Sequence, residues 1–285
     1  MSELPRPITI PEDFTVWVAT DLHGEKAVFV TALQKAGLIN KYENWCAPSV
    51  TALVILGDII DRGPDSPGLF RLLNRLRSQA VDLGSRVVLL EGNHEQMARD
   101  GLDFSNDNLN DWFYNGGDTT IDQLGLATDS RARRRNTKAL CAALDDLAPD
   151  FRPFLYSLAP YARYHDICLV HAGWPLYTSS LWHFEHTYDR LWVRDEFYNG
   201  PDLLSPNYRV FHQAGLFRVV AGHTPIGPGF FLGGRLLILD SDNTLLDLLS
   251  FNHQTTANQL TLARLPQSPG VPLSESYFLR VDKPG

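Results

Sequence analysis

Five short apolar runs constrain the fold of this chain more than any other feature of its sequence. Each holds four to seven residues and is followed directly by glycine or by an acidic residue or histidine. They cover residues 14–20, 51–56, 86–90, 167–170 and 217–221. Near-continuous apolar runs of this length are typical of strands that are buried on both faces. The chain therefore contains at least five buried strands.

Helical patterns separate the first three runs. Apolar residues recur there at three- and four-residue spacing, which places them on one face of a helix. The two sets are Phe29, Leu33 and Ala36, and Leu69, Leu72, Leu73, Leu76 and Ala80. Ser66 is the expected N-cap of the second helix. Strands alternating with helices predict βαβ units and a mainly parallel sheet.

The rest of the chain divides into two kinds of pattern. Residues 95–164 are expected to form a mostly helical insertion that covers one edge of the site, with a basic loop at 131–135. Residues 235–240, 244–249 and 259–263 predict successive strands, with a short turn at Asp242 and Asn243, in a second, antiparallel-rich sheet. With no repeat and no linker, we expect a single domain over residues 1–285.

Composition excludes several classes of protein. Acidic residues outnumber basic ones by 33 to 25, so the overall field attracts neither nucleic acid polymers nor anionic membranes. Cys46, Cys141 and Cys168 show no CxxC spacing, which argues against a disulfide framework or a thiolate zinc site. The first residues contain no apolar stretch like that of a signal peptide, and no run is long enough to span a bilayer. A cytoplasmic location is expected.

Residues able to bind metals follow all five predicted strands. Taken singly, an aspartate or histidine there is more often a turn or structural residue. Their occurrence after all five apolar runs changes the interpretation, because sites in open α/β sheets form at the carboxyl ends of strands. The candidate ligands are Asp21, His23, Asp58, Asn93, His171 and His223.

The six side chains are too many for one catalytic ion that keeps an open position. Two divalent ions roughly 3.5–4 Å apart, bridged by one carboxylate, fit them better. Oxygen and nitrogen ligands without sulfur suit manganese, our first expectation, with iron or zinc as alternatives. Two such ions outweigh two carboxylates and a hydroxide by about one unit of charge, so the site would attract phosphate.

Three segments carry a resemblance to a known family. They are Asp21-x-His23-Gly24, Gly57-Asp58-x-x-Asp61-Arg62-Gly63 and Gly92-Asn93-His94-Glu95. With Val170-His-Ala-Gly173 and Gly222-His-Thr-Pro225, they resemble the motifs of the phosphoprotein phosphatase family of calcineurin-like metallophosphoesterases. The resemblance spans residues 16–240. One departure is Thr20, where the family usually has glycine.

The resemblance implies a fold and a ligand arrangement. The fold is an α/β sandwich of two mixed sheets flanked by helices, in α/β/β/α order, with a helical insertion. Asp21 and His23 would bind one ion, and Asn93, His171 and His223 the other. Asp58 would bridge them, and a hydroxide held between the ions would attack phosphorus in line.

Further residues take roles around that centre. His94 is the candidate general acid for the leaving oxygen, and Asp61 the carboxylate that orients it. Arg62 would bind phosphate oxygens through its fork of donors, together with Asn93. The family also implies a second phosphate-binding arginine, for which Arg194 is the candidate.

Three functions fit this pattern. The first is a bacterial-type Ser/Thr phosphoprotein phosphatase, acting on a phosphorylated protein or a small phosphoester. The second is a hydrolase of dinucleoside polyphosphates, because the symmetrical diadenosine tetraphosphatases are close relatives. The third, a non-catalytic binding module, predicts the loss of a ligand or of His94, and none is lost. The sequence leaves the substrate, the metal pair and the oligomeric state open.

Overall fold

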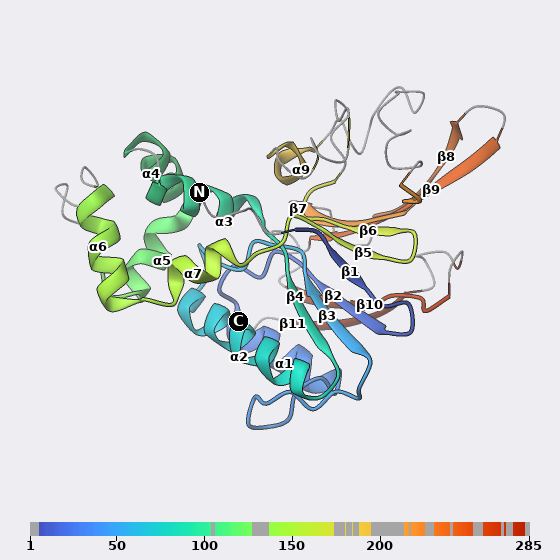
Figure 1. Ribbon diagram of the computed structural model, residues 1–285, viewed down its shortest axis with the longest axis horizontal. Helices are drawn as coiled ribbons and strands as arrows, with labels where there is room; N and C mark the ends of the chain where they lie inside the picture. The colour runs from blue at the N-terminus through green and yellow to red at the C-terminus, as the bar shows by residue number, and fades with distance from the viewer. Residues whose placement is uncertain are drawn as a thin grey trace.

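Two β-sheets pack face to face in the computed structural model, and helices lie below and to one side of them in the view of Figure 1. The structure describes residues 6–103, 106–126, 137–173, 180, 184, 188–194, 214–216, 218–225, 231–239, 242–252, 259–268, 271 and 276–282. The arrangement agrees with the predicted class of two mixed sheets flanked by helices.

The first sheet has the strand order β11-β10-β2-β3-β4. Its strands are β2 (Thr15–Ala19), β3 (Thr51–Ile55), β4 (Arg86–Leu89), β10 (Gln259–Arg264) and β11 (Tyr277–Asp282). The neighbours β2, β3 and β4 run parallel, as the βαβ pattern predicts. Strand β10 pairs antiparallel with both β2 and β11.

The second sheet has the order β1-β5-β6-β7-β9-β8. Its strands are β1 (Ile8–Ile10), β5 (Ala162–Tyr164), β6 (Ile167–Leu169), β7 (Arg218–Pro225), β8 (Phe231–Leu239) and β9 (Asp242–Asn252). Strand β6 pairs parallel with β7, and β7 pairs parallel with β9. The five apolar runs are therefore divided between two sheets.

Some details of the strand predictions were wrong. The second sheet is mixed rather than antiparallel-rich, and the predicted strand at 259–263 joins the first sheet. Asp242 and Asn243 pair with Leu239 and Ile238 within strands, so the predicted turn does not lie there. Strand pairing is set by tertiary contacts between distant segments, which apolar composition alone does not encode.

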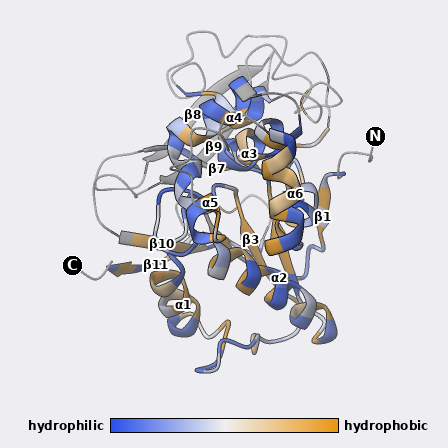
Figure 2. Ribbon diagram, turned by 90° about the vertical axis from the view of Figure 1, so that its left-hand side faces the viewer, coloured by the Kyte–Doolittle hydropathy of each residue, from blue (hydrophilic) through white to orange (hydrophobic). Residues whose placement is uncertain are grey.

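Alternate residues of the parallel strands face different cores. Leu53 and Ile55 pack with the helices below the first sheet, whereas Ala52 and Val54 pack toward the second sheet. This two-residue period is the geometry of a strand buried on both faces. Figure 2 shows the resulting hydrophobic colour along β3. The double burial fixes the strand register, and with it the positions of the loops that follow the strands.

Helices α1 and α2 cover the first sheet (Figure 1). They are α1 (Lys26–Lys35) and α2 (Ser66–Asp82). The predicted apolar faces are buried, although Ala36 lies just past α1 and is only partly buried. The N-cap of α2 is Asp65, whose carboxylate accepts from Gly68 N, so the Ser66 prediction was one residue late. The Ser66 hydroxyl instead accepts from Asp61 N.

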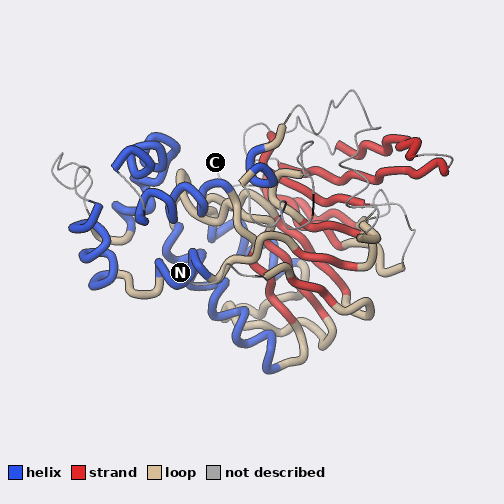
Figure 3. The backbone as a smooth tube through the Cα atoms, turned by 45° about the horizontal axis from the view of Figure 1, so that its top comes forward, coloured by secondary structure: helices blue, strands red, loops and turns tan. Residues whose placement is uncertain are grey.

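A group of helices lies at one end of the molecule, beside the sheets (Figure 3). They are α3 (Asn93–Asp103), α4 (Asn106–Trp112), the π-helix η1 (Phe113–Gly117), α5 (Asp118–Gln123), α6 (Thr137–Leu147) and α7 (Phe151–Tyr156). A short helix, α9 (Asp189–Trp192), lies near the second sheet. The basic loop at 131–135 falls outside the described residues, and the single-domain boundary stays a prediction.

No helix within the described ranges is long and apolar enough to cross a membrane.

Candidate functional site

The candidate ligands come from the ends of strands in both sheets. Asp21 and His23 follow β2, Asp58 follows β3, and Asn93 begins α3 after β4. From the second sheet, His171 follows β6. His223 lies inside β7, at a register shift between Ala221 and Pro225 that interrupts the regular pairing with β9. The site therefore lies where the two sheets meet, and not along one sheet as the sequence suggested.

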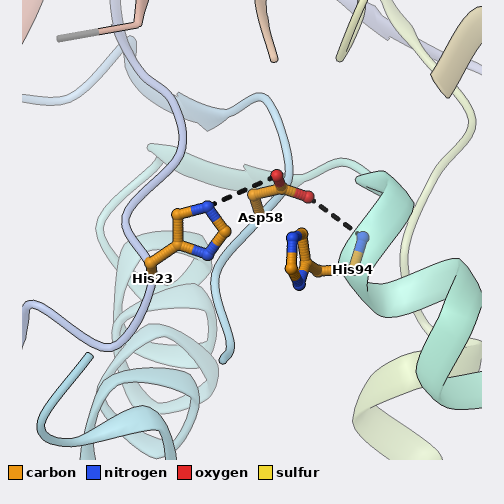
Figure 4. A group of neighbouring side chains, drawn as sticks. All are labelled: His23, Asp58 and His94. Carbon is orange, nitrogen blue, oxygen red and sulfur yellow. Dashed lines mark hydrogen bonds and ion pairs between the residues drawn. The ribbon is translucent and has the colours of Figure 1, made fainter. Parts of the chain in front are cut away.

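Asp58 is the centre of the cluster. One of its carboxylate oxygens, Oδ2, lies 3.6 Å from His23 Nε2, and the other, Oδ1, lies 3.4 Å from His171 Nε2. Figure 4 shows His23 and His94 on either side of this carboxylate. Potential ligand atoms gather within 4.8 Å of one another in two groups, and Asp58 belongs to both. The groups are His23, Asp58 and His94, and Asp58, His171 and His223.

The Asn93 amide completes the second group. Its Oδ1 position lies 2.9 Å from His171 Nε2 and 3.0 Å from His223 Nδ1. With the amide turned over, its nitrogen would instead donate to these imidazoles or to the Asp58 carboxylate, so Asn93 can act either as a hydrogen-bond donor or, through its oxygen, as a metal ligand. A cluster of lone-pair donors around one carboxylate fits the chemistry of a divalent cation.

Backbone carbonyls fix the orientation of two imidazoles. Ile60 O lies 2.9 Å from His23 Nδ1, and Leu56 O lies 2.7 Å from His171 Nδ1. A carbonyl oxygen can only accept, so each Nδ1 carries the hydrogen. The Nε2 atoms are thereby left to face Asp58, which is the arrangement found around metal-binding histidines.

Asp21 is held by hydrogen bonds from both sheets. Its Oδ2 accepts from Thr20 Oγ1 at 2.5 Å and from His223 N at 2.9 Å. Burial and the nearby Asp58 carboxylate raise the pKa of Asp21 to about 6. A cation would relieve that repulsion. Thr20, the departure from the family pattern, thus contacts the candidate ligand directly.

Two histidines of the site, His23 and His223, are kept neutral by burial. Burial lowers the pKa of His23 to about 3. It also lowers the pKa of His223 to about 2, an effect that His171 and Arg194 reinforce. Burial alone would raise the pKa of Asp58, but the surrounding histidines, His171 first, hold it below its usual range. An ionised Asp58 and neutral imidazoles at His23 and His223 are the protonation states that a metal ion requires.

The backbone of the site is strained. Among the described residues, nine non-glycine residues have positive φ angles, and six of them are candidate site residues. These six are Asp21, His23, Asp58, Asp61, Arg62 and His223. The left-handed region costs of order 1–3 kcal/mol for a non-glycine residue and persists where the surroundings enforce it. Such clustering is typical of functional sites.

Two loops meet backbone to backbone beneath Asp58. A Cβ added at Gly92 would lie 2.3 Å from Asp58 N, so only glycine permits this approach. Glu95 then bridges the loops. Its Oε2 accepts from Asp58 N at 2.9 Å and from Gly92 N at 3.0 Å, while Oε1 accepts from Ile59 N at 2.7 Å and from Ile60 N at 3.1 Å. The carboxylate fixes the loop that carries Asp58.

His94 and Asp61 form a buried pair at the edge of the cluster. His94 Nδ1 lies 2.7 Å from Asp61 Oδ2. Burial lowers the pKa of His94, but the carboxylates of Asp58 and Asp61 outweigh it and leave the pKa above its usual value. A histidine held protonated beside the cluster has the properties of a general acid.

The two candidate phosphate-binding arginines lie on the open side. Arg62 is exposed, and its Nη1 lies 3.2 Å from His23 Nε2. Arg194 is also exposed and lies close enough to affect the pKa of His223. The structure therefore places every candidate site residue at or beside one cluster.

Comparison with known proteins identifies the family. Residues 14–227, most of the chain, match the family model described as calcineurin-like phosphoesterase. The chain belongs to the calcineurin-like phosphoesterase family. Members of this family typically bind two divalent metal ions, and the described residues provide candidate ligand groups.

Curated relatives of this phosphoesterase family member include protein phosphatases. Serine/threonine-protein phosphatase 1 of Salmonella typhimurium is 29% identical over 184 residues, 65% of this chain and 70% of that protein. Shewanella-like protein phosphatase 1 of Plasmodium berghei is 38% identical over 77 residues, 27% of this chain and 21% of that protein. The chain thus spans about a fifth of the Plasmodium relative.

Solved structures support the fold. A cold-active protein-tyrosine phosphatase of a Shewanella species has a TM-score of 0.59 at 19% identity, over 97% of this chain and 83% of that one. A candidate diadenosine tetraphosphatase has a TM-score of 0.50 at 16% identity, over 99% of this chain and all of that one. At these identities the likeness concerns the fold alone.

A cavity of about 380 Å³ lies beside the phosphoesterase site. Its lining includes Asn115, whose carbonyl accepts from Arg62 Nε at 3.3 Å, and Trp192, whose ring lies 6.0 Å from that of His223. The carboxylates of Asp100 and Asp111 also line it. The lining on this side of the site therefore combines acidic and amide side chains with Met97, Tyr188 and Trp192.

Sequence reasoning missed three side chains that hold the site. Glu95 lies within a recognised motif, but nothing in the motif showed that it accepts four backbone hydrogen bonds. Trp112 and Thr120 both donate to Asp61 from the helical segment. No spacing rule in the sequence links this helical segment to Asp61.

Proposed function

We propose that the chain is a metal-dependent phosphoester hydrolase, acting as a Ser/Thr phosphoprotein phosphatase. The observation that carries this proposal is the position of Asp58, which belongs to both groups of potential metal ligands. A single carboxylate shared by two groups suits a pair of ions a few ångströms apart. The buried His94–Asp61 pair beside it supplies a candidate proton donor.

The residues fit two divalent ions as follows. Asp21 and His23 would hold one ion, Asn93, His171 and His223 would hold the second, and Asp58 would contact both. When bound, the ions lower the pKa of a water they share, so that hydroxide is available as a nucleophile at neutral pH. The nitrogen and oxygen ligand set favours manganese, with iron or zinc as alternatives.

The remaining side chains act on the substrate. Arg62 and Arg194 bind phosphate oxygens from the open side, and the Asn93 amide adds a polar contact. His94 donates a proton to the leaving oxygen, and Asp61 keeps the imidazole oriented and protonated. Without that proton a serine or threonine alkoxide is a poor leaving group.

Two observations favour a phosphoprotein over a dinucleoside polyphosphate. The curated relatives reported above are named as protein phosphatases. In addition, Asp100 and Asp111 line the cavity beside the site and would repel the extra phosphates of a dinucleoside tetraphosphate. Dinucleoside tetraphosphate hydrolysis is the second candidate, favoured by the fold neighbour of that description. The cytoplasmic location stays a prediction.

A chelation experiment tests the proposal. The protein is stripped with a chelator and restored with Mn²⁺, and hydrolysis of a phosphoserine peptide is compared with that of diadenosine tetraphosphate. We expect metal-restored cleavage of the peptide and little cleavage of the dinucleotide. The reverse preference would assign the second function. No cleavage of either substrate by protein with both ions bound would contradict phosphoester hydrolysis itself.

A further inference from the structure

Both oxygens of the Asp61 carboxylate are held by one helical segment. Trp112 Nε1 donates to Oδ2 at 2.8 Å, on the same oxygen that faces His94. Thr120 Oγ1 donates to Oδ1 at 2.7 Å. Asp61, Trp112 and Thr120 are all fully buried. The carboxylate is therefore fixed in rotation as well as in position.

The same segment holds the backbone next to Asp61. Arg62 N donates to Gly116 O, and Arg62 Nε donates to Asn115 O, each at 3.3 Å. Asp61 and Arg62 have φ angles of 75° and 64°, a conformation that is unfavourable for both residue types. Contacts from residues 112–120 thus help to hold two consecutive strained residues in place.

The indole of Trp112 is itself tightly packed. It stacks on Phe151, with ring centroids 6.3 Å apart and planes at 17°. A Cβ added at Gly117 would lie 2.4 Å from the indole, so glycine is required for this approach. A donor locked in this way keeps its hydrogen-bond direction constant.

We propose that Trp112 and Thr120 are positioning residues for proton transfer to the leaving group. They orient the Asp61 carboxylate, and Asp61 in turn fixes the imidazole of His94. This inference rests on the proposed function, because it requires His94 to act as the acid. The new element is the helical segment at 112–120. Together with the strand-end motifs, this segment sets the orientation of the His94 imidazole.

The test compares two leaving groups. The serine alkoxide of a phosphoserine peptide needs a proton, whereas the 4-nitrophenolate of 4-nitrophenyl phosphate is a stable anion and needs little assistance. In the manganese-loaded protein, Trp112→Phe keeps an aromatic ring and removes the N–H donor. Thr120→Val keeps the side-chain shape and removes the hydroxyl, while Asp61 N still donates to Ser66 Oγ.

We expect each variant to lower kcat for the peptide roughly 10- to 100-fold, the scale of a small misalignment. The effect on 4-nitrophenyl phosphate should be severalfold smaller, and Thr120→Ser should restore peptide turnover. Equal losses on both substrates, or no loss on the peptide, would overturn the inference.

Two matched controls are available within the chain. Trp45 Nε1 and Thr261 Oγ1 are buried and have no hydrogen-bond partner in the described part of the structure. Trp45→Phe and Thr261→Val therefore make the same chemical changes without removing a hydrogen bond. Both variants should retain kcat for the two substrates.

A second measurement needs no turnover, so it separates this inference from the proposed function. The zinc-loaded protein is diamagnetic, and the His94 ring signals can be assigned in nitrogen-15 NMR by their loss in His94→Asn. We expect Trp112→Phe and Thr120→Val to shift these signals and both controls to leave them unchanged. Unchanged His94 signals in both variants would overturn the inference, even if wild-type protein hydrolysed neither substrate.

Discussion

Asp61 Oδ2 lies 2.7 Å from His94 Nδ1, and neither side chain is more than 1% exposed. Through this contact, one ring nitrogen of His94 is paired with a carboxylate. It gives the histidine a different environment from His23 and His171, whose Nδ1 atoms face backbone carbonyls. The difference supports the proposed division, in which His94 transfers the proton and the other two bind metal.

His94→Asn tests that division. We expect turnover of a phosphoserine peptide to fall roughly 10²–10⁴-fold, the usual contribution of a general acid, with the metal content unchanged. Elemental analysis of the purified variant measures the metal. His94 also lies among potential ligand atoms with His23 and Asp58, so loss of an ion would show that it is a ligand and would contradict the assignment.

Arg62→Ala should weaken phosphate binding. Removing a charge-assisted hydrogen bond costs about 1.5–3 kcal/mol, which corresponds to roughly a 10- to 100-fold rise in the inhibition constant of inorganic phosphate. Competitive inhibition of peptide hydrolysis gives this constant. Arg71→Ala is the matched control, because Arg71 pairs with Asp150 on the surface. Equal inhibition constants for wild type and Arg62→Ala would contradict the role.

Glu95→Gln should destabilise the fold. The carboxylate accepts hydrogen bonds from four backbone N–H groups, and an amide would direct its own N–H toward two of them. We expect a loss of about 2 kcal/mol or more in the free energy of unfolding, measured with urea on metal-free protein. Glu43→Gln, at a partly exposed ion pair, should change it by less than about 1 kcal/mol. If Glu95→Gln lowered the free energy of unfolding as little as Glu43→Gln does, Glu95 would not be holding the two loops together.

His23 and His223 should make the metal-free protein less stable in mild acid. The pKa values of His23 and His223 fall from 6.5 to about 3 and about 2 on folding. Below about pH 6.5 the unfolded chain binds these two protons and the folded protein does not, so stability falls as the pH falls. Asp21 and Glu95, whose pKa values are raised to about 6 and about 8, act in the opposite direction, so the contribution of the histidines is measured against a variant that lacks them.

Urea unfolding of the chelated protein at pH 7 and pH 5 measures the effect. The double variant His23→Asn, His223→Asn removes both groups, so on going from pH 7 to pH 5 it should lose less stability, or gain more, than the wild type. An identical pH dependence of stability in the wild type and the double variant would show that the histidines are not buried as neutral groups.

The sequence predicted much of the fold because burial leaves a local signature. Strands β2, β3 and β4 are buried on both faces, so they appear as uninterrupted apolar runs. Strands β1 and β5, of three residues each, carry no such signature and were not predicted. The division of strands between two sheets depends on pairing between distant segments, such as β10 with β2.

The candidate ligands were predictable for a different reason. A metal site needs particular side chains at strand ends, and these occur next to glycines in short motifs. The residues whose contacts hold these motifs in place are far from them in the sequence. Trp112 is 51 residues from Asp61, and Thr120 is 59 residues from it. Only the folded backbone brings them together.

The most direct test of the whole account is a calorimetric titration of chelated protein with Mn²⁺, on wild type and on Asp58→Asn. We predict two ions bound per wild-type chain. The variant should bind at least one of them much more weakly and should lose peptide hydrolysis, because the carboxylate shared by both ligand groups is gone. A single ion in the wild type, or two ions bound with unchanged affinity by Asp58→Asn, would contradict the shared-carboxylate site.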